Sequence, residues 1–274
     1  MILDTPHGPL YYEITETPPW VTSPQTVVFC HGVAINCDLW AGWLPVTAQH
    51  FRVVRFDTRG FGRSHVEGRE FAWSLDLLAD DILAVARAAG VERFHLVGES
   101  MGGTACLRLA CREPDALLSL ACASTPHRGA KIKRVGEWRN HATREGMQAW
   151  SKQMMDDRFY PGALPQPLWD WYYDVQTRTA VKPLLEAGDM LMRADLSAEL
   201  PRIKVPTLLL APEASPVLAL DSPAEIHQLI AHSEVTVFPK SRHGLPFSHA
   251  RECAETHLAF LRRHGFGSGA PSAL

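Results

Sequence analysis

The sequence predicts an α/β protein with a mostly parallel sheet and helices on both faces of that sheet. Three observations lead to this class. Short apolar runs rich in Val, Leu and Phe recur along the chain, as buried strands require. Segments of helical length, with apolar residues at helical spacing, alternate with these runs. The chain has 274 residues, 46% of them hydrophobic, and is therefore long enough to bury a large core.

The expected strands are short and differ in how their apolar residues are spaced. The segment at 8–16 alternates between apolar and polar residues, which predicts an antiparallel strand at the edge of the sheet. Continuous apolar runs are typical of strands that helices cover on both faces. Six such runs are present: TVVFC (26–30), RVVRF (52–56), RFHLVG (93–98), LLSLACAS (117–124), PTLLLA (206–211) and EVTVF (234–238).

Helices are expected between these strands, and two of them have clear end signals. The first helix ends at Gly90, a residue type that commonly terminates helices. The second stops before Pro114, which cannot continue a helix. The four expected helices are 74–90, 101–114, 222–232 and 248–265.

One long stretch interrupts this alternation. Residues 126–204 contain no strand-like run and are rich in aromatic residues, which predicts a helical insertion between two strands. The expected organisation is a core formed by 1–125 and 205–265, with 126–204 as a helical cap. The small and polar residues at 266–274 predict a disordered tail.

The segment VGESMGG, residues 97–103, contains the pattern G-x-S-x-G with Ser100 at its centre. A strand precedes it and a helix follows, the context in which this pattern forms a sharp turn that exposes a nucleophilic serine. Such a turn needs small residues two before and two after the serine, and Gly98 and Gly102 meet that need. The helix expected to begin near Met101 would direct backbone N–H groups toward the site. We therefore predict that Ser100 is a nucleophile.

Together with three further segments, this turn resembles the α/β-hydrolase superfamily. The resemblance covers almost the whole chain, and it implies an α/β-hydrolase fold. That fold has a mostly parallel eight-stranded sheet flanked by helices, with the helical cap inserted after the sixth strand. Within the superfamily the chain most resembles the 3-oxoadipate enol-lactonase-like esterases. The three segments look like the family's loops after its third, fourth and last strands: FCHGVAINCDLW (29–40), FDTRGFGRS (56–64) and FPKSRHGLP (238–246).

A serine hydroxyl needs a positioned base to act as a nucleophile. Of the thirteen histidines, His243 is the candidate, because it follows the strand at 234–238 by a short loop, as the family's base does. The resemblance also implies an oxyanion hole formed by the backbone N–H groups of Val33 and Met101. The expected helix start gives a physical reason for the second donor. His31 is expected to shape its own loop.

The catalytic acid is where the sequence departs from the family. The family's carboxylate follows the strand PTLLLA, but here the segment reads LLLAPEASPVLALD and the acid position falls on Ser215. Three interpretations stay open: Glu213 orients His243; Ser215 or water takes that role and leaves a serine–histidine dyad; or Asp221 or another distant carboxylate serves. The acid orients the base and stabilises its charged form. Its loss therefore predicts a slow enzyme, or chemistry that depends less on a charged imidazolium.

The cap is expected to cover the carboxyl ends of the strands, where ligands bind in such sheets. Its aromatic residues predict an apolar pocket, with packing of the cap's own core as the alternative interpretation. The segment 126–144 carries six Lys or Arg against one Glu, which indicates a solvated face or an arginine that binds a substrate carboxylate. The four tryptophans assigned to the pocket are Trp138, Trp150, Trp169 and Trp171.

Composition argues against several other classes of protein. A formal net charge of −3 lacks the basic excess of nucleic-acid-binding proteins. No apolar run approaches the roughly 20 residues that span a bilayer, and the N-terminal segment has no secretory signal, so a cytoplasmic protein without membrane association is expected. The six scattered cysteines fit buried thiols. Without clustered Cys/His ligands or a nucleotide-binding loop, no metal and no cofactor are expected.

These features predict a hydrolase that cleaves a small carboxylic ester or lactone through a Ser100 acyl-enzyme, with His243 as general base. The expected partner is this small molecule, and the chain is expected to be a monomer or a homodimer. One alternative uses the same pocket for carbon–carbon bond hydrolysis, acyl transfer or cofactor-free lyase chemistry. The other, suggested by Ser215, is a catalytically weak ligand-binding pseudoenzyme.

Overall fold

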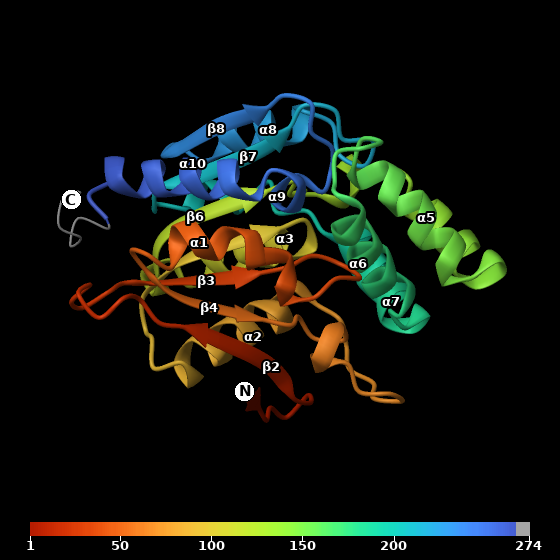
Figure 1. Ribbon diagram of the computed structural model, residues 1–274, viewed down its shortest axis with the longest axis horizontal. Coiled ribbons are helices and arrows are strands. Elements are labelled where there is room, and N and C mark those ends of the chain that lie inside the picture. The colour runs from red at the N-terminus through yellow and green to blue at the C-terminus, as the bar shows by residue number, and fades with distance from the viewer. Residues whose placement is uncertain (267–274) are drawn as a thin grey trace.

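The computed structural model describes residues 1–266, which form a central sheet between two layers of helices (Figure 1). The sheet has eight strands in the order β1-β2-β4-β3-β5-β6-β7-β8. Their bounds are β1 Ile2–Leu3, β2 Leu10–Thr15, β3 Thr26–Cys30, β4 Arg52–Phe56, β5 Phe94–Glu99, β6 Leu117–Ala123, β7 Thr207–Pro212 and β8 Ser233–Phe238.

The sheet is antiparallel at one end and parallel elsewhere. β2 pairs antiparallel with β1 and with β4, whereas all pairs from β4 through β3 to β8 are parallel. Parallel neighbours need a crossover connection, which is why helices separate these strands in the sequence. The parallel strands therefore all end at the same edge of the sheet, where ligands bind in folds of this kind.

Helix α2, Leu75–Ala88, begins and ends at residues with clear capping roles. At the start of α2, the Ser74 hydroxyl accepts a hydrogen bond from the Leu77 N–H. After its last turn, Gly90 has a φ of 75°, a conformation that favours glycine. Within residues 1–266, no helix combines the length and the apolar character needed to cross a bilayer. The core helices are α1 Leu44–Thr47, α2 Leu75–Ala88, α3 Met101–Arg112, α8 Asp221–Leu229, α9 Leu245–Ser248 and α10 Ala250–Arg263.

Two hydrophobic clusters cover the two faces of the sheet. Val28 of β3 belongs to the cluster that contains Ile82 of α2 and Leu109 of α3. Its neighbour Val27 belongs to the other cluster, together with Phe260 of α10. Successive side chains of a strand point to opposite faces, so each central strand contributes to both clusters. This explains why the strands appear in the sequence as continuous apolar runs.

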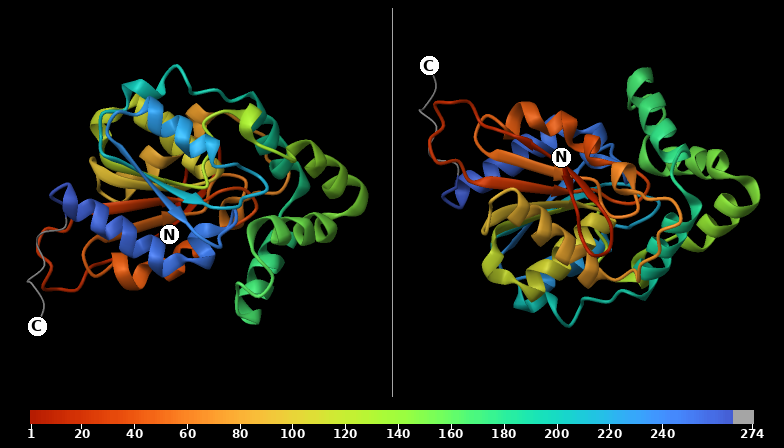
Figure 2. Two further views of the ribbon diagram at one scale, coloured as in Figure 1. Left: turned by 90° about the horizontal axis from the view of Figure 1, so that it is seen from above. Right: turned by 90° about the horizontal axis from the view of Figure 1, so that it is seen from below.

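Four helices are inserted between β6 and β7 and form the cap. They lie beyond the edge at which the parallel strands end, to one side of the sheet in both perpendicular views (Figures 1 and 2). A β-bridge between Arg128 and Asp195 brings the two ends of the insertion together. The cap helices are α4 Val135–Asn140, α5 Met147–Arg158, α6 Gln166–Thr177 and α7 Val181–Arg193, with a π-helical turn, His141–Glu145, after α4.

The structure differs from the sequence prediction mainly at the ends of the chain. The two-residue strand β1 was not expected, because two residues are too few to show a pattern. Phe266, assigned to the disordered tail, packs instead on His95, with ring centroids 4.7 Å apart. The rest of the predicted tail, 267–274, lies outside the described residues.

Candidate active site

Ser100 occupies a strained turn between β5 and α3. β5 ends at Glu99 and α3 begins at Met101, so the turn consists of Ser100 alone. Its dihedral angles, φ 53° and ψ −120°, are unfavourable for a residue with a side chain. Strain of this kind persists where the surrounding structure fixes it, and it is typical of functional sites. The turn places the serine at the carboxyl edge of the sheet, where the residue is 7% exposed.

Two glycines allow this turn because the backbone approaches other segments closely. A Cβ atom at Gly98 would lie 2.6 Å from the Cα of Gly103. A Cβ atom at Gly102 would lie 2.4 Å from the carbonyl oxygen of Cys30 in β3. Both distances are well below ordinary contact. A larger residue at either position would force α3 away from the sheet.

His243 lies in the loop after β8 and reaches Ser100 from a distant part of the chain. Its Nε2 is 3.1 Å from Ser100 Oγ, although 143 positions separate the two residues. This distance is within reach of direct proton transfer from the hydroxyl to the imidazole. His243 is 3% exposed, so the pair is shielded from bulk water.

The other ring nitrogen of His243 faces Ser215. Nδ1 is 3.3 Å from Ser215 Oγ, which also accepts a hydrogen bond from the Leu218 N–H at 3.0 Å. For Nε2 to accept the Ser100 proton, Nδ1 must carry a proton and donate it to Ser215 Oγ. A neutral hydroxyl orients the ring in this way, but it does not stabilise the imidazolium as a carboxylate does.

The two carboxylates considered as the acid bind other groups. Glu213 Oε2 accepts a hydrogen bond from the Lys240 N–H at 2.8 Å, and Asp221 Oδ2 binds Lys131 Nζ at 2.8 Å. Glu213 directly follows β7, and its carboxylate caps the turn at Lys240, whose φ of 52° is positive. The geometry therefore disagrees with Glu213 and with Asp221 as partners of His243. It agrees with the interpretation that leaves a serine–histidine pair beside Ser215.

The surroundings of His243 disfavour its charged form. Burial, and next the positive charge of Arg158, lower the pKa of His243 to about 3. A carboxylate beside Nδ1 would act in the opposite direction. The imidazole is therefore neutral at neutral pH and able to accept a proton, but it is a weak base.

The two expected oxyanion donors come from separate segments near Ser100, the start of α3 and the loop after β3. Met101 N–H is at the first turn of α3, where backbone donors lack helical acceptors and the helix dipole is positive. Val33 lies in the loop after β3, residues 31–36, which we call the β3 loop. Within residues 1–266, neither N–H donates to a protein acceptor. This leaves both donors available to a ligand oxygen.

His31 shapes the β3 loop through both ring nitrogens. Its Nε2 accepts a hydrogen bond from the Thr58 N–H at 2.8 Å. Its Nδ1 therefore carries the proton, and it donates to the Gly32 carbonyl oxygen at 2.7 Å. The side chain is fully buried, which agrees with the structural role expected of it.

A narrow pocket lies between the core and the cap above Ser100 and His243. Its lining is mainly apolar and includes Ile132, Trp138, Met154 and Leu191 from the cap, and Val33 and Leu218 from the core. The cavity volume is about 10 Å³, roughly the room that one water molecule needs. Hollows of about 110 and 270 Å³ lie nearer the loop at 59–69, but neither Ser100 nor His243 lines them. Ser100 and His243 therefore face the smaller pocket.

Of the four tryptophans assigned to the pocket, Trp138 lines it. Trp150 packs edge to face behind Trp138, with ring centroids 5.9 Å apart, and is fully buried. Trp169 stacks on a neighbour within α6, whereas Trp171 stacks on a residue of the core helix α9. Those pairs are Trp169 with Tyr173 at 5.2 Å and Trp171 with Phe247 at 5.4 Å. The alternative interpretation, that most of these aromatics pack the cap's own core, describes Trp150 and Trp169, whereas Trp171 packs α6 against the core.

The pocket contains a cation that the sequence analysis missed, Arg158 at the end of α5. It is fully buried and lies in the lining together with Ser100 and His243. One signal was available: Arg158 follows Met147 by eleven positions, Trp150 by eight and Met154 by four, which places it on the buried face of its helix. The basic segment 126–144, by contrast, forms ion pairs outside the pocket, such as Arg128–Glu225, Lys131–Asp221 and Arg139–Asp189.

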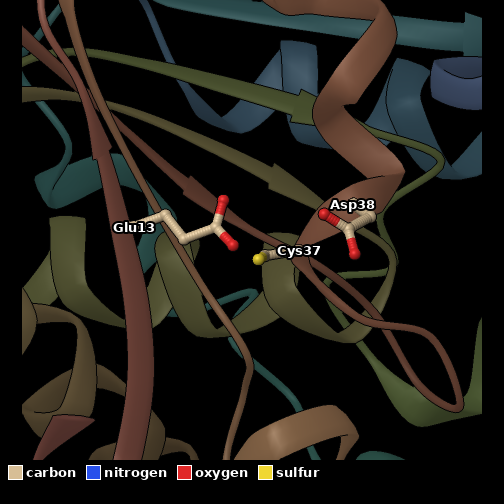
Figure 3. Close-up of side chains that lie close together, drawn as sticks. All are labelled: Glu13, Cys37 and Asp38. Atoms are coloured by element: carbon tan, nitrogen blue, oxygen red, sulfur yellow. The ribbon is translucent and has the colours of Figure 1, made fainter. Parts of the chain in front are cut away.

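One group of potential metal ligands lies close together, at Glu13, Cys37 and Asp38 (Figure 3). Arg55 and Arg63 form ion pairs with both carboxylates of this group. Arg63 also donates to Cys37 Sγ at 3.0 Å. Burial raises the pKa of the Cys37 thiol, whereas a metal needs the thiolate. The donor set is thus already neutralised by arginines and does not fit a metal ion.

The sequence profile of the alpha/beta hydrolase fold matches residues 25–250. This chain belongs to the α/β-hydrolase fold family, which confirms the family and the fold class expected from the sequence. It is 28% identical over 244 residues to the AB hydrolase superfamily protein YisY of Bacillus subtilis, covering 80% of this chain and 85% of the relative. It is 25% identical over 232 residues to 3-oxoadipate enol-lactonase 1 of Acinetobacter baylyi, covering 78% and 80%.

Solved structures share the fold over nearly the whole chain. The crystal structure of the enol-lactonase from Burkholderia xenovorans LB400 superposes with a TM-score of 0.87 at 24% sequence identity. The match covers 96% of this chain and all of that one. The similarity therefore includes the cap as well as the core.

Proposed function

We propose that this chain is a serine hydrolase that cleaves a small carboxylic ester or lactone. The observation that carries the proposal is the 3.1 Å contact between Ser100 Oγ and His243 Nε2, at the base of a shielded pocket. The family match and the names of the relatives, which include enol-lactonases, indicate a hydrolase. The strained turn at Ser100 gives independent support, because it exposes the hydroxyl to the pocket.

Acylation begins when Ser100 Oγ attacks the carbonyl carbon of the substrate and His243 Nε2 takes the hydroxyl proton. The N–H groups of Val33 and Met101 bind the oxyanion that forms. When the tetrahedral intermediate collapses, the bond to the leaving oxygen breaks, and that oxygen receives the proton from His243. The product is an ester on Ser100 and a free alcohol, or an opened lactone ring that remains attached.

Deacylation repeats these steps with water. His243 Nε2 takes a proton from a water molecule, whose oxygen attacks the acyl carbon. The second intermediate collapses, Ser100 recovers its proton from His243, and the carboxylic acid leaves. Throughout, Nδ1–H binds Ser215 Oγ, which fixes the ring orientation without adding a countercharge. We therefore expect a slower enzyme than one with a carboxylate at this position.

The dimensions of the pocket favour a short acyl group. Its cavity of about 10 Å³ holds no more than one water molecule, so an acyl group must displace the apolar lining above Ser100, and a small group displaces it least. We expect kcat/KM for p-nitrophenyl acetate to exceed that for p-nitrophenyl hexanoate by roughly tenfold or more. Steady-state hydrolysis of the two esters, measured side by side, checks this expectation. A preference for the longer chain would contradict an acyl site of this size.

The direct test is Ser100→Ala. We expect this change to lower turnover of p-nitrophenyl acetate by roughly a thousandfold or more, because no other hydroxyl is placed beside His243 Nε2 in the described residues. A fluorophosphonate should label the wild-type chain at Ser100, as detected by peptide mass spectrometry, and should not label the variant. Ser197→Ala, a serine outside the pocket, is the control and should retain activity. Unchanged turnover in Ser100→Ala would refute the proposal.

A second candidate function follows from the neutral group beside Nδ1. Acyl transfer, carbon–carbon bond hydrolysis or cofactor-free lyase chemistry fits the same pocket, and Ser215 favours reactions that build less charge on the imidazole. Product analysis by mass spectrometry separates these reactions from ester hydrolysis. A pseudoenzyme would instead show neither a burst nor steady-state release of p-nitrophenol.

A further inference from the structure

The guanidinium of Arg158 connects the cap with two segments of the core. Its Nη2 donates to the carbonyl oxygen of Val33 in the β3 loop at 3.3 Å. Its Nη1 lies 3.3 Å from Glu99 Oε1, one residue before the nucleophile. Its Nε donates to Gln176 Oε1 in α6 at 3.1 Å. One fully buried side chain thus holds the β3 loop, the end of β5 and a second cap helix.

These bonds surround the peptide group that carries the Val33 N–H. On one side, Glu99 Oε2 accepts a hydrogen bond from the Gly32 N–H at 2.8 Å. On the other side, Arg158 holds the Val33 carbonyl oxygen. Between them, the Gly32 carbonyl oxygen accepts from His31 Nδ1 at 2.7 Å. The direction of the Val33 N–H is therefore fixed by its neighbours before any ligand arrives.

We propose that Arg158 is a positioning residue, whose guanidinium couples the placement of the cap to the direction of the Val33 N–H. The inference rests on the proposed function, because it needs an oxyanion for that N–H to bind. An oxyanion donor is effective only when it points at the place where charge develops, and small displacements are costly. Arginine suits this role because its planar fork holds three acceptors in set directions, which a lysine ammonium does not.

The backbone of Arg158 adds a link to the general base. Its carbonyl oxygen accepts a hydrogen bond from the Gly244 N–H at 3.0 Å, and Gly244 directly follows His243. The guanidinium of Arg242, on the other side of the base, lies 3.4 Å from the Phe159 carbonyl oxygen. When the end of α5 is docked against the core, the loop after β8, which carries His243, and the β3 loop are both held. Displacement of the cap would release both at once.

The test compares two Arg158 variants with a matched control. Arg158→Lys keeps the charge and removes the fork. A single change to an apolar residue would leave Glu99 buried and unpaired. The second variant is therefore the double change Glu99→Gln with Arg158→Met, which removes both charges and keeps an acceptor for the Gly32 N–H. The control is Arg134→Lys, because Arg134 binds Asp157 of the same helix at 2.7 Å and, within residues 1–266, its side chain has no hydrogen bond to the β3 loop or to the loop after β8.

Activity is measured with p-nitrophenyl acetate and divided by the number of sites that a fluorophosphonate labels to completion. We expect kcat per labelled site to fall by roughly ten- to a hundredfold in both Arg158 variants, with KM within about threefold of wild type. The affinity for a trifluoromethyl ketone, whose adduct places an oxyanion in the hole, should fall by a similar factor to kcat/KM. Arg134→Lys should stay within about twofold of wild type.

A purely structural role for Arg158 would lower the melting temperature and the number of labelled sites, and leave kcat per site unchanged. That result, or a change confined to KM, or an unchanged affinity for the trifluoromethyl ketone, would overturn the proposal. Because two variants are used, a failure of one to fold still leaves the other to decide. Failure of the proposed function looks different: wild-type protein would not turn over the ester, or Ser100→Ala would retain activity.

Discussion

Two turns face the imidazole of His243 from opposite sides, and they are built differently. The turn after β5, on the Nε2 side, is close-packed through backbone contacts, and Gly102 has no room for a Cβ atom. The turn after β7, on the Nδ1 side, is half-buried, and its contact with the ring is the single hydroxyl of Ser215. The first turn keeps the family pattern, whereas the second departs from it.

The difference shows which part of such a site can vary without loss of the fold. On the Nε2 side, the position of Ser100 follows from the packing of α3 against the sheet, so a change there alters the core. On the Nδ1 side, the residue at position 215 contributes one side-chain contact at a partly exposed loop. Substitution of the acid therefore changes the electrostatics of the base and leaves the scaffold intact.

The largest effect should come from adding a methyl group to the first turn. In Gly102→Ala, the new Cβ atom would lie 2.4 Å from the Cys30 carbonyl oxygen, so α3 or β3 must shift. We expect the free energy of unfolding to fall by about 1–3 kcal/mol and kcat for p-nitrophenyl acetate to fall by about a hundredfold or more. Urea unfolding and ester hydrolysis measure the two effects.

The matched change in the second turn is Ala214→Ser, at an exposed position beside Ser215. Its free energy of unfolding should stay within about 0.5 kcal/mol of wild type. Comparable losses in the two turns would remove the contrast between them.

The next effect concerns the negative charge that position 215 lacks beside His243 Nδ1. Ser215→Asp would place a carboxylate where Oγ now lies 3.3 Å from His243 Nδ1, with the Leu218 N–H as a second donor to it. Because a carboxylate stabilises the imidazolium, we expect kcat to rise by roughly ten- to a hundredfold. Ser215→Ala is the control and should lose less than about tenfold, since it removes a neutral acceptor. A decrease in Ser215→Asp would show that this loop cannot hold an acid in register with the ring.

Wild type and Ser215→Asp should also differ in the pH dependence of kcat/KM. With a His243 pKa of about 3, the wild-type base is unprotonated down to strongly acidic pH, so activity should not fall between pH 7 and 5. The new carboxylate raises the pKa of the ring, and the acid limb of Ser215→Asp should therefore move up by roughly one to three pH units. Profiles of kcat/KM from pH 4 to 9 provide the measurement. Superimposable profiles would contradict the electrostatic difference between the two sides of the ring.

The last comparison sets His243 beside buried imidazoles away from the site, where no effect on catalysis is expected. His95 and His257 also have pKa values lowered to about 3, mainly by burial. Below a pH of about 6.5 the unfolded chain binds protons that these folded-state histidines do not. Each therefore makes the free energy of unfolding fall by about 1.4 kcal/mol per pH unit as the pH drops from about 6.5 toward 3.

His257→Gln should remove one of these contributions. The loss of stability per pH unit between pH 6 and 4 should then be smaller than in wild type by about 1.4 kcal/mol. Urea unfolding followed by tryptophan fluorescence at several pH values measures both slopes. Equal slopes in wild type and His257→Gln would mean that the pKa of His257 is the same in the folded and the unfolded chain.

Much of the fold and half of the candidate site could be predicted from the sequence. The strands appear as apolar runs because helices cover both faces, and the end of α2 appears at Gly90 because a positive φ favours glycine. Ser100 was identified because its turn imposes small residues at fixed positions. These features are local, since each depends on neighbours within a few residues along the chain.

The tertiary structure alone decided which of the three alternatives faces Nδ1 of His243. Ser215 rather than Glu213 faces Nδ1, because Glu213 caps the turn at Lys240. Arg158 enters the pocket, and its helical spacing indicates only that it lies on the buried face of α5, not what it contacts there. Such contacts join segments that are dozens to more than a hundred positions apart. Their geometry depends on the order of the strands in the sheet and on how the cap packs against the core. The sequence thus determined the turn at Ser100 and the scaffold, whereas packing between distant segments determined the electrostatic surroundings of the His243 imidazole.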